Sequence, residues 1–141
     1  MVMRSRELDP LYGCSGRWGS GAFLNGAVEL VTTLDGEQLL AGLLEIERHH
    51  GRVRRERWGD RTLDLDVVCG FDERGRDRVR DTPTLTLPHP NLWARDFVLQ
   101  PLVDIDAGLR VEGRSCAAQL ATLADDQRTL LRRLDETLDP R

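Results

Sequence analysis

The chain has 141 residues, a formal net charge of −4, and hydrophobic and charged fractions of 40% and 31%. These values predict a single globular domain over 1–141 and argue against a disordered chain. They give no support for a general nucleic-acid surface, and no apolar run approaches the roughly 20 residues that cross a bilayer. We therefore expect a cytoplasmic protein with no nucleic-acid or membrane partner.

Arginine supplies all 20 residues of the lysine-plus-arginine count, because the sequence contains no lysine. This excludes a Walker A lysine and a Schiff-base lysine. Any bound phosphate must then be held by arginine, backbone amides or metal ions. Cys14, Cys69 and Cys116 lie far apart without zinc-type spacing, and we expect three reduced thiols.

The first third of the chain predicts two strands and a helix. An edge strand is expected over 3–12, and apolar–polar alternation predicts a second strand over 23–33. Asp35 and Gln38 match a variant of the capping box, which predicts a helix over 37–50. The residues that this helix is expected to bury are Leu39, Leu40, Leu43, Leu44 and Ile46.

An arginine-rich loop over 52–61 leads into an alternating strand expected over 62–68, and a solvated loop is expected over 70–82. Residues two apart on a strand project to the same side with a repeat of roughly 7 Å, so Asp64 and Asp66 point together. Magnesium bound with nucleotide phosphates would relieve the repulsion between these carboxylates, and the arginines would bind the same phosphates. An ordinary acidic strand face beside a solvated charged loop is the alternative.

The last part of the chain carries a proline-punctuated segment over 85–101, a short strand expected over 109–111 and a helix capped by Ser115. Leucines at helical spacing predict an amphipathic tail helix over 125–138, so 124–141 is expected to form a C-terminal helical extension. This order of elements predicts an α+β fold, with helices packed on one face of a sheet.

Two further groups of residues carry possible chemistry. His89 lies between two prolines, where a structural histidine is the alternative. Phe23 shares a strand face with Asn25, and Phe97 follows the proline-punctuated segment, although both rings could be ordinary core residues. An aromatic ring beside an amide would form a wall and a hydrogen-bonding floor for a flat heterocycle.

Three segments in this order, FLNGAVELVTTL, GRVRRERWGDRTLDLDVV and LTLPHPNLWARDFVLQPL, closely resemble the 6-hydroxymethyl-7,8-dihydropterin pyrophosphokinase family. The resemblance covers about residues 11–111. It implies a ferredoxin-like sheet and an enzyme of folate biosynthesis. The family transfers a diphosphate from ATP, its co-substrate, to 6-hydroxymethyl-7,8-dihydropterin, giving the pterin diphosphate and AMP, with two Mg²⁺ ions.

The resemblance also implies roles for individual residues. Asp64 and Asp66 would bind magnesium and act in catalysis together with Arg52 and Arg61. The substrate-binding residues would be Phe23, Asn25, Trp58 and Phe97. The ATP-binding residues would be Glu47, Arg54, Arg57, Thr86, His89 and Arg95. The sequence departs from the family at its lysine-bearing nucleotide positions and at Pro90, where tyrosine is common.

Family members normally open with a strand, a Gly-Ser-Asn turn and a helix, so we expect this chain to be N-terminally truncated relative to the family. One alternative is a catalytically impaired remnant that binds a ligand or a partner. An RNA-binding module is another, but it would need exposed aromatic residues on adjacent strands, a pattern absent from the sequence. Fusion or association with other folate-pathway enzymes stays an open alternative.

Overall fold

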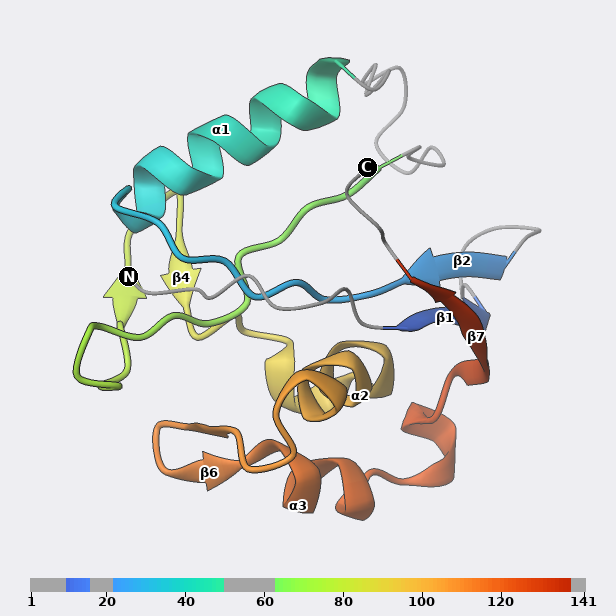
Figure 1. Cartoon of the computed structure of the whole chain (residues 1–141). Helices are drawn as coiled ribbons and strands as arrows, with labels where there is room; N and C mark the ends of the chain where they lie inside the picture. The colour runs from blue at the N-terminus through green and yellow to red at the C-terminus, as the bar shows by residue number, and fades with distance from the viewer. Residues whose placement is uncertain (1–9, 16–21, 50–62, 138–141) are drawn as a thin grey trace. The chain divides into compact units, whose positions relative to one another are not determined.

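The computed structural model describes residues 10–15, 22–49 and 63–137 (Figure 1). These residues divide into two compact units, each considered by itself. The first comprises 32–49 and 63–89, and the second comprises 10–15, 22–31 and 90–137. Of the helices within the described ranges, none combines the length and the apolarity that crossing a bilayer requires.

The first unit is built around helix α1, Gly36–His49. Its beginning is fixed by a reciprocal capping box, in which the Gln38 amide N–H donates to Asp35 Oδ1 (2.8 Å) and the Asp35 amide N–H donates to Gln38 Oε1 (3.0 Å). Glycine lets α1 begin close to the Leu85 side chain, because a Cβ on Gly36 would lie 2.7 Å from a Leu85 methyl carbon and that side chain would have to shift. The prediction of a capped helix over 37–50 is therefore confirmed to within one residue at each end.

The buried face of α1 differs in part from the prediction. Leu39 is buried as expected, whereas Leu44 and Ile46 are 38% and 45% exposed. At 100° per residue, the buried stripe that starts at Gly36 and ends at Glu47 leaves Leu44 and Ile46 on its two flanks. The expectation that both residues are buried was wrong for this geometric reason.

Two short strands complete the first unit, β3 (Arg80–Asp81) and β4 (Thr86–Leu87), which pair antiparallel. The segment 63–70 precedes them and belongs to no ladder, so the strand predicted over 62–68 does not appear as a paired strand in its described part. The core of this unit is formed by apolar side chains from α1, from the segment 63–70, and from β4 and the residue before it: Leu39, Val67, Leu85 and Leu87.

The second unit contains a three-stranded antiparallel sheet in the order β2-β1-β7. Its strands are β1 (Pro10–Ser15), β2 (Ala22–Asn25) and β7 (Leu130–Thr137). The strand predicted over 23–33 thus begins as expected but ends at Asn25, because 26–31 makes no ladder. Mixed helices and small antiparallel sheets in the two units confirm the α+β class.

Helices and a hairpin make up the rest of the second unit. The elements are η1 (Leu92–Ala94), α2 (Asp96–Ile105), β5 (Arg110–Val111), β6 (Arg114–Ser115), α3 (Cys116–Thr122) and η2 (Asp125–Gln127). Positive φ angles at Glu112 (50°) and Gly113 (76°) form the two-residue turn between β5 and β6. The strand predicted at 109–111 and the Ser115 cap are both confirmed, the latter by the Ala118 amide N–H donating to Ser115 Oγ (3.2 Å).

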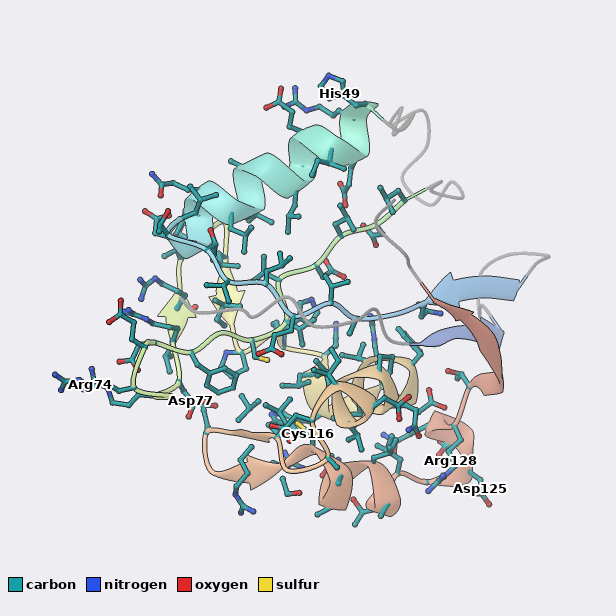
Figure 2. All side chains as sticks on the ribbon, viewed as in Figure 1. His49, Arg74, Asp77, Cys116, Asp125 and Arg128 are labelled. Carbon is teal, nitrogen blue, oxygen red and sulfur yellow. The ribbon has the colours of Figure 1, made fainter. Side chains whose placement is uncertain are left out.

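Helices α2 and α3 pack against each other, and Cys116, the first residue of α3 (labelled in Figure 2), is fully buried. Burial raises the pKa of the Cys116 thiol, and the negative charge of Asp106 adds to the effect. Cys69 and Cys116 are both free thiols, as predicted. Cys116 therefore serves as a small apolar core residue.

The tail helix predicted over 125–138 was wrong. A single turn of 3₁₀-helix, η2, is followed by strand β7, whose backbone pairs with β1 from Leu130 opposite Cys14 to Thr137 opposite Pro10. The leucine spacing reflects only a weak local preference for helix. Pairing with β1, more than 100 residues earlier in the sequence, outweighs this preference. In its described part, the expected helical extension over 124–141 instead consists of η2 followed by strand β7.

Candidate functional site

The acidic pair lies in the segment 63–70 of the first unit, the green trace that leads toward β3 in Figure 1. Asp64 and Asp66 are exposed, whereas Leu63 and Leu65 are half-buried and Val67 is buried. This alternation of exposure is the one that the sequence predicted, although the segment is not part of a ladder. Both carboxylates therefore lie on the solvent side of a backbone whose apolar side chains point inward.

Helix α1 anchors this backbone midway between the two aspartates. The Leu65 amide N–H donates to Glu47 Oε1 at 2.7 Å, and Glu47 itself is only 1% exposed. A short hydrogen bond to a buried carboxylate is among the stronger contacts that a backbone amide can make. Glu47, predicted as a nucleotide-side residue, thus lies beneath the acidic pair and holds its backbone in register.

A second anchor lies two residues beyond the pair. The His89 amide N–H donates to the Val68 carbonyl oxygen at 2.7 Å. His89 is half-buried, and Thr86 is exposed on β4. The structure therefore brings His89 and the segment carrying Asp64 and Asp66 together, and backbone hydrogen bonds hold that segment at Leu65 and at Val68.

Two other candidate residues meet at the start of α2 in the second unit. The Arg95 guanidinium lies over the Phe97 ring, 5.6 Å from its centroid, which is within the range of a cation–π contact. Arg95 is exposed and Phe97 is half-buried. The Arg95 carbonyl accepts the first hydrogen bonds of α2, from the amides of Val98 (3.2 Å) and Leu99 (3.1 Å).

Asp96, between those two residues, was not singled out from the sequence. Its side chain is 3% exposed and accepts hydrogen bonds from the Phe97 amide (2.8 Å) and from the amide and hydroxyl of Thr129. An acidic residue in the first turn of a helix was the available signal, but its partner lies 33 residues later. No local pattern pointed to that partner.

The remaining candidates are described only in part. Phe23 and Asn25 are two apart on β2, where Phe23 is opposite Cys14 and Asn25 is opposite Tyr12. Asn25 is half-buried. The candidates of the arginine-rich loop lie outside the described residues: Arg52, Arg54, Arg57, Trp58 and Arg61.

Within the described ranges, no cluster of three or more His, Cys, Asp or Glu side chains could enclose a metal ion. Asp64 and Asp66 supply two exposed carboxylates. Mg²⁺ commonly binds through one or two carboxylates, with phosphate oxygens and water completing its shell. The pair fits a metal that arrives with a polyphosphate rather than a closed protein cage.

The family model described as 7,8-dihydro-6-hydroxymethylpterin-pyrophosphokinase matches residues 3–107. The chain belongs to this family. All the candidate residues, from Phe23 to Phe97, lie within the part that matches the pyrophosphokinase model, whereas α3, η2 and β7 follow it. The resemblance drawn from the three sequence segments is thereby confirmed.

The chain is similar to two curated bacterial pyrophosphokinases and to a plant protein of folate synthesis. A 2-amino-4-hydroxy-6-hydroxymethyldihydropteridine pyrophosphokinase of Synechocystis sp. is 42% identical over 99 residues, which cover 65% of this chain and 48% of the relative. Its counterpart in Pseudomonas aeruginosa is 45% identical over 100 residues, covering 70% of this chain and 59% of the relative. A protein of Pisum sativum named folate synthesis bifunctional protein, mitochondrial, is 42% identical over 83 residues, covering 59% of this chain and 15% of the relative. The chain thus spans about half of the Synechocystis pyrophosphokinase and three-fifths of the Pseudomonas one.

Proposed function

We propose that this protein transfers a diphosphate from ATP to 6-hydroxymethyl-7,8-dihydropterin, giving the pterin diphosphate and AMP in folate biosynthesis. The observation that carries the proposal is the exposed pair Asp64 and Asp66, whose backbone is held by Glu47 and His89. Membership of the pyrophosphokinase family supports the choice of reaction. The scaffold proposed for it is a ferredoxin-like sheet, and the proposed location is the cytoplasm.

In the proposed reaction the pterin hydroxymethyl oxygen attacks the β-phosphorus of ATP. The bond between the β-phosphorus and the oxygen bridging to the α-phosphate breaks, and AMP leaves with that oxygen. The hydroxyl proton is released as the new phosphate ester forms. Positioning and charge stabilisation account for most of the catalysis in phosphoryl transfer, so no covalent intermediate with the protein is needed.

Each group of residues has a proposed part. Asp64 and Asp66 would hold magnesium, two ions in our proposal, and the metal would supply positive charge beside the polyphosphate. Thr86, His89 and Arg95 bind ATP, and the ring of Phe97 stacks on the pterin while Asn25 hydrogen-bonds its edge. Phe23 and Trp58 also bind the pterin in this proposal. Arg54 and Arg57 of the arginine-rich loop bind ATP, and Arg52 and Arg61 stabilise charge on the group being transferred.

The test replaces each carboxylate by the isosteric amide. Asp64→Asn and Asp66→Asn should each lower magnesium-dependent AMP release at least roughly a hundredfold, because a preorganised group that stabilises transition-state charge contributes about that much. Both side chains are exposed, so the melting temperature should stay near that of the wild type. Asp81→Asn, at an exposed aspartate on β3, is the matched control and should retain full turnover. Near-normal turnover in either acidic-pair variant would overturn the assignment.

A further inference from the structure

Asp96 lies between two residues of the proposed site, yet its side chain points into the protein. Its carboxylate is 3% exposed, while Arg95 is exposed and Phe97 is half-buried. One carboxylate oxygen, Oδ1, accepts from the Phe97 amide (2.8 Å) and from Thr129 Oγ1 (2.8 Å). The other, Oδ2, accepts from the Thr129 amide (2.6 Å).

Thr129 comes from a part of the chain beyond the match to the family model, which ends at residue 107. The preceding residue, Arg128, is labelled in Figure 2 and anchors this segment to the end of α3. Its guanidinium donates to the carbonyl oxygens of Leu123 (3.2 Å), Leu120 (3.4 Å) and Ala121 (3.4 Å), a favourable place for a cation at a helix C-terminus. Consecutive residues thus connect the end of α3 to the start of α2.

We propose that Asp96 is a positioning residue, and that its contact with Thr129 fixes the first turn of α2 so that Phe97 is held ready to stack on the pterin. This inference rests on the proposed function. Fixing the ring before the ligand arrives lowers the entropy that binding would otherwise cost. The segment leading into β7 therefore contributes to pterin affinity without touching the pterin.

The geometry offers a variant that removes a single hydrogen bond. Thr129→Val keeps the shape of the side chain and the amide bond to Oδ2, and removes only the hydroxyl donor to Oδ1. Thr129→Ser restores the donor. The matched control is Thr122→Val on α3, whose hydroxyl donates to the Gln119 carbonyl oxygen (2.8 Å) and has no contact with Asp96. Asp96→Asn is the stronger change, because an amide keeps one acceptor oxygen, whereas the carboxylate accepts hydrogen bonds on both of its oxygens.

The first readout needs no ligand. The chain has three phenylalanines, so fluorophenylalanine labelling gives a ¹⁹F spectrum of three signals, and Phe97→Leu identifies the one that belongs to Phe97. Thr129→Val and Asp96→Asn should shift or broaden the Phe97 signal, whereas Thr129→Ser and Thr122→Val should leave it in place. An unchanged Phe97 signal in both Thr129→Val and Asp96→Asn overturns the positioning role, whatever happens to the melting temperature.

The second readout is pterin affinity, measured by calorimetry well below the melting temperature. Thr129→Val should raise the pterin Kd at least roughly tenfold, the lower end of the effect expected for losing one hydrogen bond to a charged group. Thr129→Ser should restore the wild-type value. An unchanged Kd in Thr129→Val, or an equal rise in Thr122→Val, overturns the inference. A wild-type protein that binds no pterin overturns the proposed function instead, and the ¹⁹F comparison then decides the positioning role by itself.

Discussion

Removing the Glu47 side chain should detach the segment 63–70, which carries Asp64 and Asp66, from α1. In Glu47→Ala the Leu65 amide loses its carboxylate partner, which lies 2.7 Å away in the wild type. Because Glu47 is only 1% exposed, removing its side chain also leaves a void in the protein. A hydrogen bond to a charged group contributes about 1.5–3 kcal/mol, and the void adds roughly 1 kcal/mol, so the free energy of unfolding should fall by about 2.5–4 kcal/mol. A domain with an unfolding free energy of about 5–15 kcal/mol remains folded after that loss.

Glu47→Gln separates the hydrogen bond from the charge. Its amide oxygen can still accept from Leu65, so we expect a loss of only about 1 kcal/mol relative to wild type. The matched control is Glu45→Ala on the exposed side of the same helix, whose contact with Arg48 is a long 3.8 Å. An exposed ion pair of this kind contributes little, and that variant should stay within about 0.5 kcal/mol of wild type.

The assay combines urea unfolding with turnover at varied magnesium concentration. If Glu47 holds Asp64 and Asp66 in register, Glu47→Ala should require more magnesium for half-maximal AMP release, and Glu47→Gln should lie between it and the wild type. An unfolding free energy of Glu47→Ala equal to that of Glu45→Ala would refute the contribution assigned to the Leu65 contact. If Glu47→Ala needs no more magnesium than the wild type, the proposed link between Glu47 and the pair Asp64 and Asp66 is refuted.

Two further predictions concern stability. Gly36→Ala should destabilise the protein by about 1–3 kcal/mol, because its Cβ would lie 2.7 Å from the Leu85 side chain. A Cβ on Gly42 meets nothing within 4 Å, so Gly42→Ala should stabilise α1 by roughly 0.5–1 kcal/mol. Urea unfolding of both variants measures the difference. The pKa of Asp72 is lowered from 3.8 to about 2, chiefly by the backbone hydrogen bond from Arg76. Its contribution to stability is therefore present above about pH 4 and is lost as the pH falls toward 2. Asp72→Asn should flatten the decline of the melting temperature over that interval, and an unchanged slope would contradict the assignment.

Local signals predicted local structure well. The start of α1 followed from Asp35 and Gln38, because a capping box involves residues only three apart. The outward side of Asp64 and Asp66 followed from the two-residue period of an extended chain, which needs no knowledge of the neighbouring strand. The Ser115 cap of α3 belongs to the same class.

Contacts between distant segments could not be predicted in this way. The leucines of 130–138 fit a helix in isolation, and only pairing with β1 makes Leu130–Thr137 a strand. The contact from Asp96 to Thr129 and the one from Glu47 to Leu65 span 33 and 18 residues. Neither residue pair has a spacing that marks it as a pair, so the supports of the proposed site emerged only from the structure.

The most direct test of the proposed reaction follows the phosphorus atoms. The wild-type protein is incubated with magnesium, ATP and 6-hydroxymethyl-7,8-dihydropterin, and the products are followed by ³¹P NMR. Transfer of a diphosphate predicts that AMP and the pterin diphosphate appear in equal amounts, and that neither forms without the pterin. Formation of ADP with a pterin monophosphate, or no pterin-dependent loss of ATP, would contradict the account.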